Sequence, residues 1–353
     1  MHLFEYSGLT AEIPADIFDS IVSIERMRAL DPIRLSEYRF AIPKAEQLMP
    51  RAAAESARYL FGANMAGYAQ AMLGMLGADD RLFFDAGLPA LHKVVTGEGC
   101  DIDDGAREAL SQLSESFRMA DEVDVNPLLL VPAATLDLIN IAPFGESTVP
   151  TAMALMQGLL ATRGFPSLRC ISLESMMDKE DFEEAVVEGS IGWEDGASDP
   201  FPFVRCVCEA VLLCERRFDI AYPLDMGRKL DKSTRILNII KSSREPVSKA
   251  EVCDIAPDIS RRTADSVIAE LVDAQLVEKV GSFKDARYAS SGTGLRGSQR
   301  HSRSRERVRI GIKPLICQSF WKIRACVFIY GDNVRRTPNR LVRIGMHSRT
   351  RPR

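Results

Sequence analysis

Apolar residues recur at helical spacing through most of the first 225 residues. Amphipathic helices are predicted over 15–30 and 43–61, and further helices over 82–95, 106–119, 172–187 and 201–218. No part of the chain before residue 230 shows the alternation of apolar and polar residues that several paired strands would require. The pattern therefore predicts a mainly α fold for this part of the chain.

Two strongly apolar segments in its middle predict a buried helix pair. Asn126 can cap the first helix and Pro127 suits its first position, while the apolar run 128–141 ends before Ala142-Pro143. Pro150 is expected to open the second helix, which runs to residue 163 and stops at a glycine.

Residues 231–289 have a different pattern. Helices are predicted over 231–242, from Ser248, and over 261–274, and two short strands are predicted at 276–280 and 287–288. Three helices followed by a hairpin within about sixty residues are typical of a winged helix-turn-helix domain.

The charge changes sign near the C-terminus. Residues 291–353 hold 16 Lys or Arg against 2 Asp or Glu, whereas the preceding 290 residues hold 29 against 47. A step of this kind marks a domain boundary or a tail, and 290–353 is expected to be poorly ordered. One interpretation is a nucleic-acid-binding arm. The other, which the apparent end of the hairpin at Tyr288 favours, is an adventitious extension such as a frameshift would add.

The remaining composition is ordinary for a soluble protein. Of the 353 residues 46% are hydrophobic, and no apolar run reaches the roughly 18–20 residues that span a bilayer. The N-terminus lacks the basic and apolar stretches of a secretion signal, and the eight cysteines form no C-x-x-C pair. We therefore expect free thiols, no membrane partner and a cytoplasmic location.

The junction 141–153 between the two buried helices is the candidate for chemistry. A loop delivered to a helix N-terminus brings free backbone N–H groups and the helix dipole together, which suits an anion. The alternative is a helix start capped by Ser147 or Thr148. The residues alone leave both interpretations open.

This junction resembles the central motif of the Fic (Fido) family, which reads H-P-F-x-[D/E]-G-N-G-R. Pro143 and Phe144 match it, and Glu146 stands at the acidic position. Trp193 followed by 198–201 is similar to a later family segment. The resemblance covers about 1–289.

The resemblance implies a fold and a domain order. It implies an N-terminal helical region at 1–60, a Fic-like helical core at 61–225 and a winged-helix domain at 231–289.

The chain departs from the family motif where the chemistry lies. Ala142 replaces the histidine that would accept a proton from a target hydroxyl, and alanine cannot act as a general base. Ser147, Thr148 and Val149 replace the Gly-Asn-Gly of the phosphate cradle. The two phosphate-binding arginines are replaced by Pro150 and Met153.

Two accessory features of the family are also absent from the pattern. No hairpin is predicted over 95–125, where a flap would align the target, and 56–61 lacks the glutamate of an inhibitory helix. We therefore predict a catalytically inactive Fic-like binding or regulatory module with no cofactor.

Two alternatives to this prediction stay open. One is a weak protein adenylyltransferase that uses ATP and Mg²⁺, with the cation on Glu146. The other is a decaying gene product without a role.

The candidate DNA-binding residues lie in the predicted recognition helix and the wing. The cap and first turn of the helix contribute Ser260, Arg261, Arg262 and Thr263. The wing contributes the basic residues Lys284 and Arg287. Winged helices also bind proteins or form homodimers, and Asp265 and Glu270 dilute the positive charge. DNA, a protein partner and a second copy are therefore all candidate partners.

Overall fold

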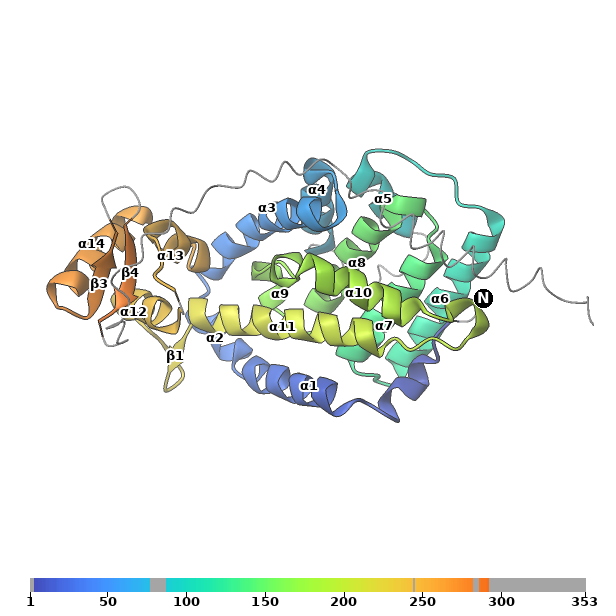
Figure 1. The fold of residues 1–353 in the computed structure, drawn as a ribbon, viewed down its shortest axis with the longest axis horizontal. Helices are drawn as coiled ribbons and strands as arrows, with labels where there is room; N and C mark the ends of the chain where they lie inside the picture. The colour runs from blue at the N-terminus through green and yellow to red at the C-terminus, as the bar shows by residue number, and fades with distance from the viewer. Residues whose placement is uncertain (1–2, 77–86, 244, 282–285, 292–353) are drawn as a thin grey trace, which may run out of the picture. The chain divides into compact units, whose positions relative to one another are not determined.

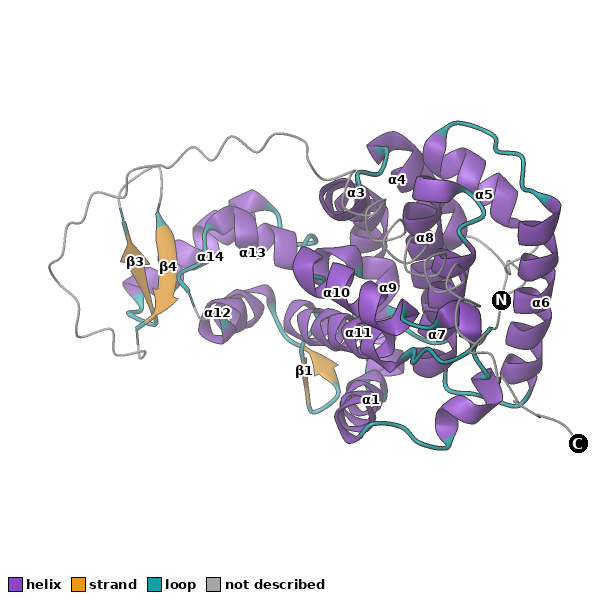
Figure 2. Cartoon of the chain, turned by 45° about the vertical axis from the view of Figure 1, so that its right-hand side comes forward, coloured by secondary structure: helices purple, strands orange, loops and turns teal. Residues whose placement is uncertain are grey.

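The computed structural model describes residues 3–76, 87–243, 245–281 and 286–291 (Figure 1). Helices dominate these residues, and the strands among them are short (Figure 2). The mainly α fold class predicted from the sequence is confirmed.

The elements fall into two sets along the chain. The first set comprises η1 (Tyr6–Thr10), α1 (Ala15–Arg28), α2 (Asp31–Glu37), α3 (Ile42–Phe61), α4 (Met65–Leu76), α5 (Gly87–Thr96), α6 (Asp104–Glu122), α7 (Pro127–Ile141), η2 (Gly145–Ser147), α8 (Thr148–Thr162), α9 (Ser167–Cys170), η3 (Glu174–Met176), α10 (Lys179–Ser190), η4 (Trp193–Asp195) and α11 (Phe201–Ala221). The second comprises β1 (Leu224–Asp225), β2 (Arg228–Lys229), α12 (Lys232–Ser242), α13 (Lys249–Ile255), α14 (Arg261–Asp273), β3 (Val277–Val280) and β4 (Arg287–Ser290).

The predicted buried helix pair, α7 and α8, forms the centre of the first set. Every residue of α7 from Leu128 to Ile139 is buried. The Asn126 side chain accepts a hydrogen bond from the Leu128 N–H at 2.9 Å and Pro127 occupies the first turn, as the sequence predicts. Helix α7 packs against α6, α8 and α11, and α8 packs against α4 and α5. Both ends of the loop between α7 and α8 are therefore held by neighbouring helices.

A buried carboxylate on α7 ties two distant segments to the core. Asp137 accepts hydrogen bonds from the Tyr6 hydroxyl, from the Phe4 N–H at 3.1 Å and from Trp193 Nε1 at 2.6 Å. Burial outweighs these three donors and raises the pKa of Asp137 to about 6. The N-terminal segment and η4 are thus joined through one side chain.

The N-terminal helices pack onto the same core. Helix α1 lies along α11, and α3 contacts α4 and α9. The buried Arg34 of α2 pairs with Asp31 at 2.9 Å and with Asp219 of α11 at 2.5 Å. Residues of the predicted 1–60 region are therefore in direct contact with helices 150 or more residues later.

Helices α12, α13 and α14 and the β3–β4 hairpin form the segment 231–290, which we call the helix–hairpin segment. Its apolar core includes Ile236, Ile239, Ile268 and Tyr288. The Ser248–Glu251 capping box opens α13 as predicted. The antiparallel hairpin pairs Val277–Val280 with Arg287–Ser290. The three helices and the hairpin predicted from the sequence are all present.

The structure corrects two predicted boundaries and adds two elements. The helix predicted over 172–187 is a 3₁₀ turn followed by α10, because Asp178 caps a new helix at Glu180 N, 2.8 Å away. Helix α8 begins at Thr148, two residues before Pro150. The β1–β2 hairpin and α2 were not predicted. The part of the predicted 82–95 helix before Gly87 lies outside the described residues.

Candidate functional site

The loop between α7 and α8 begins with a left-handed residue. Ala142 has φ 49° and ψ 52°, and its N–H donates to Leu138 O at 3.1 Å. Glycine usually occupies such a helix C-terminus because a Cβ is disfavoured there. Gly145, three residues on, also has a positive φ of 57°. The position predicted to have lost a histidine is therefore the residue that reverses the chain out of α7.

The protein's own side chains occupy the first turn of α8. Thr148, Val149 and Pro150 are buried, and Pro150 has no N–H to offer. Thr148 Oγ1 accepts from Phe144 N at 3.0 Å, and Thr151 Oγ1 donates to Ser147 O at 2.8 Å. Two threonine hydroxyls therefore bond backbone groups of the loop and of the helix start, whereas the side-chain cap by Ser147 or Thr148 considered from the sequence is not formed.

A histidine that the sequence reasoning did not connect with the loop lies against it. The imidazole of His92, on α5, stacks on Phe144 with ring centroids 4.0 Å apart and an interplanar angle of 9°. His92 Nδ1 lies 3.3 Å from Thr151 Oγ1. Because the Thr151 hydroxyl donates its hydrogen to Ser147 O, Nδ1 is the donor of this pair and Nε2 the unprotonated nitrogen. Burial lowers the pKa of His92, which favours this neutral form.

The signal for His92 was present but incomplete in the sequence. Leu88, His92 and Val95 follow one another at helical spacing and are all buried in α5. That spacing predicts an inward-facing histidine. It does not predict the contact with a loop some fifty residues later, because that contact depends on how α5 packs against α8.

Glu146 lies exposed in η2, and Met153 is buried in α8. Among the described residues, no group of three or more His, Cys, Asp and Glu side chains comes close enough together to hold a metal ion. A cation at this loop would therefore need Glu146 together with oxygen atoms from groups other than His, Cys, Asp and Glu side chains.

The two accessory regions discussed from the sequence serve other purposes in the structure. In α3, Leu60 is buried and Phe61 packs on Phe182 of α10, with ring centroids 4.9 Å apart. Residues 97–103 form a loop that leads into α6, and the fully described range 87–126 contains no strand. The positions that the resemblance aligns with the family's inhibitory glutamate and flap are thus a packing contact and a helical region.

Helix α14 presents a polar first turn to solvent. Ser260 caps the helix by accepting from Thr263 N at 3.2 Å, and the side chains of Arg261 and Arg262 are exposed. On the opposite face, Ala264 and Ile268 are buried. Two guanidinium groups and a capped helix N-terminus therefore share one exposed turn, which suits phosphate or base contacts.

The other basic residues near this helix are engaged differently. Arg287 donates to Pro246 O at 2.8 Å and pairs with Glu251 at 3.3 Å. Lys249, at the start of α13, pairs with Asp265 of α14 at 2.7 Å. Lys284 lies outside the described residues. Of the predicted DNA-binding residues, Ser260, Arg261, Arg262 and Thr263 are the ones that the structure gathers in one place.

No protein-family model matches the chain, and no curated protein matches it. A search of solved structures finds a Fic family protein from Desulfovibrio desulfuricans G20 with 13% sequence identity and a TM-score of 0.44. The alignment covers 81% of this chain and 98% of that protein. Within the described residues, no helix combines the length and the hydropathy needed to cross a bilayer.

Proposed function

We propose that the chain is a Fic-like protein that does not transfer nucleotides and acts as a binding or regulatory module. The observation that supports this most directly is the closed first turn of α8. Thr148, Val149 and Pro150 are buried there, and the threonine hydroxyl is bonded to Phe144 N. A phosphate cradle needs free N–H groups at this place. Ala142 adds the loss of the motif's general base.

His92 does not replace that base in the proposal. Its ring is buried and stacked face to face on Phe144, and its Nδ1 hydrogen bonds to Thr151. A general base must reach the proton that it removes within about 3 Å. In this position His92 stabilises the loop through stacking and one hydrogen bond.

The inactive loop is tested with labelled ATP. The protein is incubated with ATP labelled on the α-phosphate, Mg²⁺ and a cell lysate, and label on any protein is measured. We expect none above the background of a heat-inactivated sample, and we expect Ala142→His not to restore it, because α8 stays closed. Labelling that disappears in Glu146→Ala would contradict the proposal. A rise in Tm with millimolar ATP would also contradict it.

We propose DNA as the ligand of the helix–hairpin segment, read as a winged helix with α14 as its recognition helix. Supporting this are the exposed Arg261 and Arg262 in the first turn of α14 and the buried Ala264 and Ile268 behind them. Arginines at a helix N-terminus can contact phosphates and the edge of guanine. A protein partner on the same surface is the competing ligand class.

The DNA proposal is tested by fluorescence anisotropy with random-sequence and genomic duplexes. We expect the double variant Arg261→Ala/Arg262→Ala to bind at least about tenfold more weakly. The matched control is Arg51→Ala/Arg107→Ala, which removes two exposed arginines, with side chains 82% and 66% exposed, from α3 and α6. Equal loss in both double variants would indicate nonspecific charge attraction and would contradict a recognition role for α14.

A weak protein adenylyltransferase is the second candidate function, favoured by one observation. His92 brings an imidazole to Phe144 and Thr151, beside the degenerate motif. Transfer of AMP to a protein hydroxyl would then need Phe144 to leave the imidazole face, with ATP and Mg²⁺ held near Glu146. Any labelling in the ATP experiment that is lost in His92→Ala would favour this candidate.

A further inference from the structure

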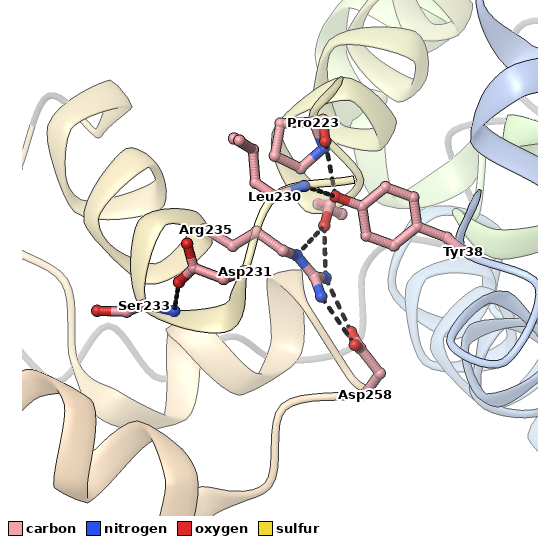
Figure 3. Close-up of polar contacts among 8 residues, drawn as sticks. Tyr38, Pro223, Leu230, Asp231, Ser233, Arg235 and Asp258 are labelled. Carbon is pink, nitrogen blue, oxygen red and sulfur yellow. Dashed lines mark hydrogen bonds and ion pairs between the residues drawn. The ribbon is translucent and has the colours of Figure 1, made fainter. Parts of the chain in front are cut away.

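The junction between α11 and the helix–hairpin segment is organised around one buried guanidinium (Figure 3). Arg235, on α12, is 2% exposed. Its Nε and Nη2 donate to Ala221 O at 3.1 and 2.6 Å, and its Nη1 and Nη2 donate to the two carboxylate oxygens of Asp258 at 2.8 and 2.9 Å. Bidentate pairs of this kind are strongly directional.

Each partner of Arg235 belongs to a different part of the chain. Ala221 is the last residue of α11, so its carbonyl has no partner within that helix and favours a cation. Asp258 stands two residues before Ser260, the cap of α14. The guanidinium therefore joins the end of α11 to the turn that starts the proposed recognition helix.

Two tyrosines complete this cluster. The guanidinium carbon of Arg235 lies 5.0 Å from the ring centroid of Tyr38 and 5.6 Å from that of Tyr222. The two rings pack edge to face with centroids 5.3 Å apart. Tyr38 follows α2, so the N-terminal helices contribute to the same contact.

Tyr38 also fixes both ends of the connection between α11 and α12. Its hydroxyl donates to Pro223 O at 2.6 Å and accepts from Leu230 N at 3.1 Å (Figure 3). Between these points the chain forms the β1–β2 hairpin, in which Arg228 and Lys229 are exposed. The connection is thus closed by one hydroxyl group at its base.

We infer that Arg235 is a positioning residue that locks the helix–hairpin segment to α11, so that α14 moves together with the helical core. The lock has three parts: the Ala221 carbonyl, the Asp258 carboxylate and the two tyrosine rings. Without it, the connection 222–231 opens and the helix–hairpin segment, which has its own apolar core, moves independently. This inference does not depend on the ligand of α14.

Trypsin tests the lock, because Arg228 and Lys229 lie inside the closed connection. Cleavage of a transiently opened segment follows the population of the open form. In Arg235→Met, native-state cleavage after these two residues is expected to rise at least about 30-fold, since Asp258 and the Ala221 carbonyl lose their partner. Tyr38→Phe removes only the hydroxyl and is expected to raise cleavage about fivefold.

The matched control is Arg163→Met. Arg163 has a side chain 10% exposed and pairs with Asp121, within the helical core. This variant loses a comparable ion pair, yet its cleavage after Arg228 and Lys229 is expected to stay within twofold of the wild type. Arg235→Lys keeps the charge but not the bidentate geometry, and it is expected to lie between the wild type and Arg235→Met.

Hydrogen exchange shows whether Arg235 holds the helix–hairpin segment against α11 or is needed for that segment to fold. In Arg235→Met we expect the amides of Ile239 and Leu271, in the core of the helix–hairpin segment, to keep their protection while 222–231 loses it. Loss of protection at Ile239 and Leu271 would overturn the inference, because Arg235 would then be needed for the segment to fold. An unchanged cleavage rate in both Arg235→Met and Tyr38→Phe would also overturn it.

Discussion

At the scale of single residues, Ala142 matters both for the proposed loss of catalysis and for the backbone of the loop after α7. Under the proposed function it occupies the position of the motif's proton acceptor, and its side chain has no group that can accept a proton. It is also a left-handed residue at the end of α7, with φ 49°. An alanine there is conformationally unfavourable, so the loop keeps a backbone shape that its sequence does not favour.

Replacing Ala142 by glycine should therefore stabilise the protein. We expect the free energy of unfolding to rise by about 0.5–1 kcal/mol, because glycine adopts positive φ without a Cβ penalty. The control is Ala52→Gly at an exposed position within α3, which should lower it by about 1 kcal/mol. Urea denaturation of the two variants measures both changes. A loss of stability in Ala142→Gly would contradict the left-handed backbone.

Asp137 makes stability depend on pH. Its pKa is raised to about 6 in the folded protein, above the ordinary value of 3.8, so the folded state holds the proton more tightly than the unfolded state. The stability that this provides is complete below about pH 4 and is lost as pH rises through 6, by up to about 3 kcal/mol. Urea denaturation between pH 4 and 8, compared with Asp137→Asn, isolates this contribution. If the difference in unfolding free energy between the two proteins stays constant over this pH range, the raised pKa of Asp137 is contradicted.

At the scale of elements, the β1–β2 hairpin has an unfavourable turn. Met226 and Gly227 have φ 48° and 77°, the left-handed pair of a tight two-residue turn, and Met226 is 97% exposed. Asparagine followed by glycine is the favoured sequence for this turn. The exposed methionine side chain therefore makes few packing contacts, and these do not offset the unfavourable energy of its left-handed backbone.

We expect Met226→Asn to stabilise the hairpin by about 0.5–1 kcal/mol and to slow trypsin cleavage after Arg228. Gly227→Ala should have the opposite effect, by about 1 kcal/mol, although no atom lies within 4 Å of the added Cβ. Opposite changes in stability at two neighbouring positions distinguish an effect of turn geometry from a general effect of mutation. Equal effects of the two substitutions would contradict the turn assignment.

Elements with local signals were predictable from the sequence, and those set by distant contacts were not. The start of α7 follows from Asn126 and Pro127, and the start of α13 follows from the Ser248–Glu251 capping box. The β1–β2 hairpin was missed because its turn contains Met226 rather than asparagine and its base is closed by Tyr38, about 190 residues earlier.

The candidate sites show the same division. The exposed arginines of α14 follow from helical spacing and a serine cap, both local features. The contact of His92 with Phe144 depends on the packing of α5 on α8, which no local pattern encodes. The burial of the first turn of α8 likewise depends on tertiary packing and could not be predicted from the sequence. The residues that replace the family motif there can nevertheless be read from the sequence.

At the scale of the whole molecule, the buried first turn of α8 in the helical core contrasts with an exposed helix start in the helix–hairpin segment. In the core, Phe144 of the loop between α7 and α8 is bonded through its N–H to Thr148 and stacked on His92. In the helix–hairpin segment, Arg261 and Arg262 remain exposed. The first 290 residues carry an excess of acidic groups, so nonspecific attraction to nucleic acid by this part of the chain is weak. Under the DNA proposal, a contact made by the first 290 residues would therefore come from a local basic surface such as the start of α14.

The salt dependence of DNA binding shows whether Arg261 and Arg262 contact the phosphates of a duplex. For the full chain and for Arg261→Ala/Arg262→Ala, the association constant for a duplex is measured by anisotropy at several salt concentrations. Each lost phosphate contact lowers the slope of log K against log salt by about 0.9, so two arginines should lower it by about 1.8. If α14 binds DNA, the double variant shows this smaller slope together with weaker binding. Identical slopes and affinities, or no binding by the wild type, would contradict it.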